Sequence, residues 1–270
     1  MQSKVLARVS SALLALAAAQ AGAQQIPVED FAKYPDLEEA ALSPTGEYLA
    51  LAVPASSGKE TNLQIFSLAE GKTVKTLRFG QESHVMDVTW TADDTITVAR
   101  AKRYPGEEFL RSTGQLMSTN VTGDKQRTLF AYLLDDGQQR GRKKDEGSAY
   151  LATTLDKEPG KILVNFYCWE YYCGEDGDTV VYKVDTITGE RKEVERIKDG
   201  DSNSGLIFDH DGVARVAYAR NKDGTPRISY RPTPQSPWQP LAKSLAGYEI
   251  ANGVFAEDNN TLYAEVSDTG

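Results

Sequence analysis

The chain has 270 residues, 40% of them hydrophobic and 26% charged, which is enough apolar material for a sizeable core and argues against wholesale disorder. Its formal net charge is −9 at pH 7, so its surface repels nucleic-acid phosphates and anionic lipids, and binding to them by counterion release is not expected. Thirteen Tyr and eight Phe favour strands, and 22 Gly and 11 Pro supply frequent turns, so the composition indicates a mostly β protein.

The N-terminus has the pattern of an export signal. Lys4 and Arg8 precede an apolar run over 9–19, and the small-x-small sequence Ala-Gly-Ala that follows is of the kind that signal peptidase cuts. The run is too short for a permanent span, and no later segment approaches about 20 consecutive apolar residues. We therefore expect a signal peptide over 1–23 and a mature chain in a bacterial periplasm or outside the cell, free of the membrane after cleavage. A retained N-terminal anchor is the alternative.

A strand and turn unit begins at residue 41 and repeats along the chain. The sequence ALSPTGEYLALAV over 41–53 sets an apolar lead, a Ser-Pro-x-Gly turn and an alternating strand in a row. The unit returns in degenerate form at 86–101, 153–167, 205–219 and 253–266. The equivalent turn positions are taken as Ser43, Thr91, Asp156, Asp209 and Glu257, with spacings of 48, 65, 53 and 48 residues. These spacings lie in or just above the range of about 40–50 residues typical of a four-stranded propeller blade.

A second hairpin follows each of the first four units, at 63–77, 115–130, 180–197 and 227–242. Each repeat therefore offers four strands. A four-stranded blade has two apolar faces and must stack on its neighbours. We therefore expect the alternating Leu49, Leu51 and Val53, and in the same way Ile162, Val164 and Phe166, to lie against the adjacent blade. We predict an all-β fold with a lead-in segment over 24–41 and a partial β-propeller domain over 42–270.

The fifth unit has one hairpin where the others have two. The prediction is therefore an incomplete propeller of about four and a half blades. Such an arrangement exposes unpaired backbone groups and apolar sheet faces, which folded proteins avoid or cover. We expect the chain to be the N-terminal part of a longer protein or a truncated product.

Two cysteines, Cys168 and Cys173, lie between two strand-like runs. Export to an oxidising compartment favours a disulfide between them that clamps a hairpin loop. Two free or separately buried thiols are the alternative. A zinc site is not expected, because the chain has two His and lacks four ligands at suitable spacing. We expect neither a metal nor a cofactor.

The 41–53 unit, the exported leader, the lead-in IPVEDFAKYPDLEEAALSP and the TGERKEV style of hairpin resemble the N-terminal β-propeller of the prolyl oligopeptidase family. The resemblance is strongest to the exported bacterial dipeptidyl-peptidase and acylaminoacyl-peptidase branch, and covers 26–270. It implies a serine peptidase whose propeller caps the active site and restricts entry to short peptides. In that family a following α/β-hydrolase domain carries the Ser, Asp and His of the triad, so this chain alone is expected to be inactive.

A second function fits the same repeats. The translocation protein TolB and other periplasmic propellers use a similar Ser-Pro-x-Gly turn. The alternative to a peptidase portion is therefore a stand-alone periplasmic propeller that binds a protein partner.

The nucleophile elbow of an α/β-hydrolase, G-x-S-x-G, is missing. The nearest approach, over 200–205, has Ser204 in the fifth position, and strand alternation resumes at once instead of a helix. The two candidates for a general base are His84, in a polar link before a blade, and His210, in a blade turn. We interpret both as ordinary turn histidines, although a triad is recognised by geometry rather than by chain order. No catalytic residue is assigned.

Two acidic groups have simpler interpretations than a ligand site. Asp199, Asp201 and Asn203 have the alternate spacing that starts a calcium loop, but the later EF-hand positions are wrong, so a solvated turn is favoured over a calcium site of another type. Glu107 and Glu108 lie side by side in a loop. Dipeptidyl peptidases related to the family hold the substrate's amino terminus with a paired Glu from the propeller. Here the pair falls in an early blade, so an exposed charged loop is favoured.

Overall fold

The computed structural model divides the chain after Pro35, and every strand that the structure describes belongs to the unit Asp36–Gly270. The structure describes residues 35–107, 109–132, 144–169, 179–197, 205–221, 223–241 and 248–268. The predicted signal peptide and most of the lead-in lie outside these residues. In the described part, no helix is long and apolar enough to cross a membrane.

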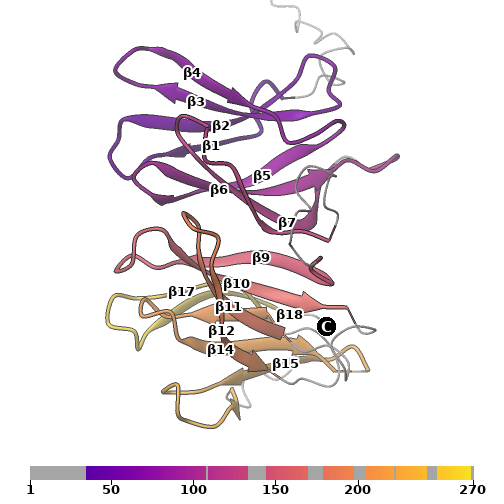
Figure 1. The fold of residues 1–270 in the computed structure, drawn as a ribbon. Coiled ribbons are helices and arrows are strands. Elements are labelled where there is room, and N and C mark those ends of the chain that lie inside the picture. Colours follow the sequence, from indigo (N-terminus) through magenta and orange to yellow (C-terminus); the bar gives the residue numbers. More distant parts are fainter. Residues whose placement is uncertain are drawn as a thin grey trace, which may run out of the picture. The chain divides into compact units, whose positions relative to one another are not determined.

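The described strands form five antiparallel sheets, here called blades 1 to 5, and each blade occupies its own stretch of the chain (Figure 1). Blade 1 contains β1 (Glu39–Leu42), β2 (Tyr48–Pro54), β3 (Thr61–Ser67) and β4 (Lys72–Leu77). Blade 2 contains β5 (His84–Ala92), β6 (Thr95–Lys102), β7 (Arg111–Asn120) and β8 (Arg127–Phe130). Blade 3 contains β9 (Gly147–Thr154), β10 (Lys161–Cys168), β11 (Thr179–Asp185) and β12 (Arg191–Ile197). Blade 4 contains β13 (Gly205–Phe208), β14 (Ala214–Arg220), β15 (Pro226–Tyr230) and β16 (Gln239–Pro240), and blade 5 contains β17 (Tyr248–Phe255) and β18 (Leu262–Asp268).

This architecture confirms the predicted all-β fold of about four and a half propeller blades. In blades 1 to 4 the strands are hydrogen-bonded in chain order, as the two predicted hairpins per repeat require. β1 begins at Glu39, within the stretch that the sequence assigned to the lead-in. Among the described residues, no core cluster joins blade 1 to blade 5, so the sheets do not close.

The Ser-Pro-x-Gly turn owes its glycine to the backbone conformation. The carbonyl of Ser43 accepts a hydrogen bond from the N–H of Gly46, and the carbonyl of Asp209 accepts one from Gly212, both at 2.9 Å. Gly46 has φ +72° and Gly212 has φ +74°, in the left-handed region that side chains with a Cβ rarely adopt. The glycines therefore fix where the chain reverses between the first two strands of blades 1 and 4.

The predicted equivalence of the turns is off by one residue in two blades. In blade 5 it is Ala256, not Glu257, whose carbonyl accepts the N–H of Asn259, which takes the left-handed conformation at φ +55°. In blade 3 the corresponding residue is Leu155, not Asp156. The sequence comparison took the first polar residue after each strand as the start of the turn. Where an apolar residue starts the turn, as in blades 3 and 5, this choice is one residue too late.

Four apolar clusters lie between successive blades and hold them together. The first cluster joins blades 1 and 2 and contains Leu63, Ile65, Trp90 and Val98. The next three join blades 2 and 3, blades 3 and 4, and blades 4 and 5 in the same manner. Because burial is shared between neighbours, no single blade encloses a core of its own.

The buried side of β2 differs from the expectation. Ala50 and Ala52 are fully buried in the cluster against blade 2, whereas Leu49, Leu51 and Val53 are half-buried on the opposite face. Small residues at 50 and 52 leave room for the larger side chains of the neighbouring strands. The period of two in the sequence identified this strand but assigned the wrong set to the blade contact. In β10 the assignment is confirmed, because Ile162, Val164 and Phe166 are buried in the cluster between blades 2 and 3.

The face of blade 1 that points away from blade 2, here called the front face, carries no charged side chain. Strand register places ten residues on it: Ala40, Leu42, Leu49, Leu51, Val53, Asn62, Gln64, Phe66, Thr73 and Thr76. Every one of the ten is half-buried or exposed. A charge-free face is unusual on a chain in which 26% of the residues are charged, and it has the composition of a surface that another sheet covers.

Lysine placed on each side of β2 tests this assignment of faces. Ala52→Lys is expected to lower the free energy of unfolding by more than about 3 kcal/mol, because it buries an ammonium group without a partner. Leu51→Lys, the matched control on the front face, is expected to change it by less than about 1 kcal/mol. Urea unfolding followed by circular dichroism measures both. Equal losses for the two variants would contradict the assignment.

Candidate functional site

His84 is the first residue of β5 and is 3% exposed. It is therefore a buried strand residue, whereas the sequence predicted that it lies in a polar link. Its Nδ1 lies 2.9 Å from Oγ1 of Thr61, the first residue of β3, which joins blade 2 to blade 1. Burial lowers the pKa of His84, and the positive charge of Arg103 lowers it further, against an opposing effect of Glu60. The imidazole is therefore held neutral inside a contact between blades.

His210 lies in the turn between β13 and β14, as predicted. Its Nε2 donates a hydrogen bond to the carbonyl of Phe255 in blade 5 at 2.8 Å. A carbonyl only accepts, so Nε2 carries the proton, and Nδ1 of the neutral ring is an acceptor. The backbone N–H of His210 donates to Oδ1 of Asn259 at 2.9 Å, which fixes the turn against the same blade.

Both histidines thus link neighbouring blades. In the described part of the chain their hydrogen bonds go to Thr61, Phe255 and Asn259, and none goes to the hydroxyl of a serine. The stretch 200–204, with Ser202 and Ser204, lies outside the described residues. The described residues therefore bring together no serine and histidine of the kind that a catalytic triad needs.

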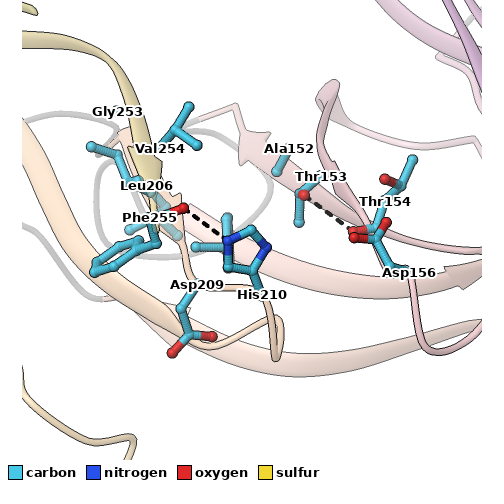
Figure 2. Close-up of a pocket in the computed structure, with 12 residues that line it drawn as sticks. Ala152, Thr153, Thr154, Asp156, Leu206, Asp209, His210, Gly253, Val254 and Phe255 are labelled. Carbon is cyan, nitrogen blue, oxygen red and sulfur yellow. Dashed lines mark hydrogen bonds between the residues drawn. The ribbon is translucent and has the colours of Figure 1, made fainter. Parts of the chain in front are cut away.

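A pocket of about 330 Å³ opens where the first strands of blades 3, 4 and 5 end (Figure 2). Its walls are formed by the end of β9 and the turn after it, by β13 with its turn, and by β17. The lining residues include Thr153, Asp156, Leu206, His210, Gly253 and Val254. Gly253 allows the close approach of β17 to β13, because a Cβ there would lie 2.3 Å from Cδ1 of Ile207.

Asp209 lines the pocket, but both of its carboxylate oxygens are used in structural contacts. Its side chain is buried, its Oδ1 accepts the N–H groups of Asp211 and Val213, and its Oδ2 lies 3.0 Å from Nη1 of Arg215. The guanidinium of Arg215 also donates to the carbonyl of Asn259 in blade 5 at 3.0 Å. This carboxylate therefore holds the turn and the contact between blades, and its charge is neutralised.

The two neighbouring carboxylates, Asp211 and Asp156, differ in the number of hydrogen bonds and ion pairs that they form. Asp211 lies 2.6 Å from Nζ of Lys157 and accepts a hydrogen bond from Nδ2 of Asn259 at 3.0 Å. Asp156 is exposed in the turn after β9, and it has no hydrogen bond or ion pair with the described residues. In Figure 2 the ring of His210 lies between Phe255 and the segment that carries Thr153 and Asp156.

This pocket was not predicted from the sequence. Its residues come from three repeats, and each repeat by itself shows an ordinary polar turn. A usable signal was present, however, because equivalent turns of successive blades lie on the same rim. Polar residues that recur at 153–156 and 209–210 are thereby brought together with the end of β17.

Of the other sequence-predicted site residues, those that the structure describes do not line the pocket. Cys168 ends β10 and is 5% exposed, and Cys173 lies outside the described residues, so the disulfide stays a prediction. Glu107 forms an ion pair with Arg111 at 2.5 Å in the loop between β6 and β7, whereas Glu108 lies outside the described residues.

The calcium hypothesis concerns the segment between blades 3 and 4. Asp199, Asp201 and Asn203 are also outside the described residues. Among the residues that the structure does describe, no group of three or more His, Cys, Asp or Glu is placed to hold a metal ion.

No protein-family model and no curated protein sequence matches the chain. Solved structures resemble it at low identity. An acylaminoacyl peptidase from Pyrococcus horikoshii is 12% identical over 86% of this chain and 36% of that chain, with a TM-score of 0.49. A prolyl endopeptidase is 13% identical over 85% and 31%, with a TM-score of 0.46. The Dos1 propeller is 12% identical over 84% and 52%, with a TM-score of 0.45.

The chain thus spans about a third of the two peptidases and about half of the Dos1 structure. At these identities and TM-scores the likeness concerns the fold alone. The assignment to propeller blades rests on the strand order and hydrogen-bond register of this chain itself.

The buried His84 predicts a pH dependence of stability. Its pKa is lowered in the folded chain, so below the ordinary value of 6.5 the unfolded chain binds more protons. Stability is fully present above about pH 6.5 and is lost as the pH falls from there through the lowered folded pKa. His84→Asn is expected to reduce the difference between the urea midpoints at pH 7.5 and 5.5.

Thr61→Val is the matched control for this experiment. It removes the hydrogen bond but leaves the buried imidazole, and burial is the largest cause of the lowered pKa. The variant is therefore expected to keep the pH dependence of the wild type while lowering stability at both pH values. An unchanged pH dependence in His84→Asn would contradict the prediction.

Proposed function

We propose that this chain is the propeller portion of an exported serine peptidase of the prolyl oligopeptidase type. In this proposal the propeller limits the access of peptides to a hydrolase domain outside the chain, and the mature protein acts in the periplasm or outside the cell. The proposal is supported by the Ser-Pro-x-Gly hairpins, the signal-like N-terminus and the four-stranded blades. Its substrates are peptides that reach the hydrolase domain.

The use of the two histidines is the observation that carries the proposal. A Ser nucleophile needs an adjacent base, and histidine is the usual one. The chain has two histidines, and each is committed to a contact between blades, through Thr61 in one case and Phe255 in the other. These contacts favour a scaffold that restricts access over a chain that performs the hydrolysis.

The front face of blade 1 favours a second candidate function. A charge-free surface of this kind also suits a stand-alone periplasmic propeller that binds a protein partner. The two candidates differ in the size and reactivity of the native protein, so one experiment separates them.

Detection of the native polypeptide in its own cells tests the proposal. Antibodies raised against 36–270 are expected to recognise a band well above the mass of this chain. The same band is expected to react with a fluorophosphonate probe for serine hydrolases, and prior treatment with phenylmethanesulfonyl fluoride should abolish the labelling. A band of the chain's own mass that takes no label would refute the proposal and favour the partner-binding propeller.

Assay of the purified chain provides an independent check. The proposal expects no hydrolysis of chromogenic dipeptide or acyl-amino-acid substrates. Hydrolysis by the wild type that disappears in Ser202→Ala would place the chemistry on this chain and overturn the proposal.

A further inference from the structure

The pocket between blades 3, 4 and 5 presents hydrogen-bond acceptors. Nε2 of His210 is occupied as a donor by the carbonyl of Phe255, so Nδ1 of the neutral ring accepts. The hydroxyl of Thr153 donates to the carbonyl of Thr154 at 3.1 Å, which leaves its oxygen lone pairs for another donor. With the carboxylate of Asp156, three acceptors belong to the lining of one pocket.

The charge of the pocket is negative. The charge of Asp209 is compensated by Arg215, and the nearby Lys157 is held by Asp211. Asp156 is left as a carboxylate without a charged partner among the described residues. The net charge of −9 on the whole chain adds a long-range attraction for cations.

Apolar side chains complete the lining. Leu206 and Ile207 are buried beside the opening, and Val254 is 61% exposed although it is a large hydrophobic residue. A volume of about 330 Å³ lies at the lower end of the range for small-molecule pockets, which is about 300–1,000 Å³. The space therefore suits one side chain or a small amine.

We propose that this pocket binds an organic cation, an ammonium or guanidinium group on an apolar stem, such as a lysine or arginine side chain of a peptide. The cationic head lies against Asp156, Nδ1 of His210 and Oγ1 of Thr153, and the stem lies against Val254 and Leu206. A metal ion is not the ligand proposed: Asp156, Asp209 and His210 all line the pocket, but no group of three or more His, Cys, Asp or Glu among the described residues is placed to hold one. The site is independent of the proposed peptidase and assigns a binding activity to the chain itself.

A pair of probes that differ in charge tests the head group. Binding of N-acetyl-lysine methylamide to the purified chain is measured by isothermal titration calorimetry at low salt. N-acetyl-norleucine methylamide, which has the same backbone and an uncharged aliphatic stem, is expected to bind at least about tenfold more weakly. The affinity for the lysine probe is expected to fall as salt is raised, since the pocket is open to solvent.

A pair of variants tests the position. Asp156→Asn is expected to weaken binding of the lysine probe about tenfold, because it removes the charge from a charge-assisted hydrogen bond. Glu257→Gln is the matched control, since it removes one exposed carboxylate from the neighbouring blade 5 turn, outside the pocket lining, and is expected to leave affinity unchanged. Both turns are exposed, and circular dichroism confirms that each variant is folded.

Three results would overturn the proposal. They are no measurable binding of the lysine probe, equal binding of the norleucine probe, and equal affinities for Asp156→Asn and the wild type. None of them depends on peptidase activity, so failure here leaves the proposed function standing and the reverse is also true.

Discussion

Shared burial between successive blades is the constraint on which the rest of the structure depends. A four-stranded sheet has two faces, and each blade of this chain buries at least one of them against a neighbour in a common apolar cluster. Polar bonds reinforce the same contacts: the indole N–H of Trp90 in blade 2 donates to the carbonyl of Ala41 in blade 1 at 2.9 Å. At the next contact, the hydroxyl of Ser118 in blade 2 donates to the carbonyl of Thr186, the residue that follows β11 in blade 3, at 2.7 Å. Stability in such a stack accumulates from nearest-neighbour contacts.

The same constraint decides which polar residues are free to act on a ligand. Turns that follow the first strands lie beside one another, and their side chains are largely used to join blades. Asp209 and Arg215 hold the turn of blade 4 against blade 5, and Asp211 bridges Lys157 and Asn259. The polar side chains left for binding are those that these contacts do not use. In the pocket, the main one is the carboxylate of Asp156.

Sequence patterns predicted the repeat and the hairpins, because turn chemistry and period-two alternation are local properties. The Ser43 to Gly46 turn is an example, since its glycine is needed for a left-handed φ. Properties that depend on neighbouring repeats were predicted only in part. The sequence placed His84 in a polar link, yet it is the first residue of β5 and lies against Thr61. Likewise, both faces of β2 are apolar, so alternation alone did not identify Ala50 and Ala52 as the buried pair.

The pocket depends on the stack in a way that links binding to stability. Its walls belong to three blades, so it exists in the form described while blades 3, 4 and 5 are in contact. A ligand that binds the stacked state and not the unfolded chain stabilises the stack by RT ln(1 + [L]/Kd), which is about 2.7 kcal/mol at a concentration one hundred times Kd. His210 contributes to both sides of this linkage, because its Nε2 joins blade 4 to blade 5 and its side chain lines the pocket. Occupation of the pocket and cohesion of the last two blades are therefore parts of a single equilibrium.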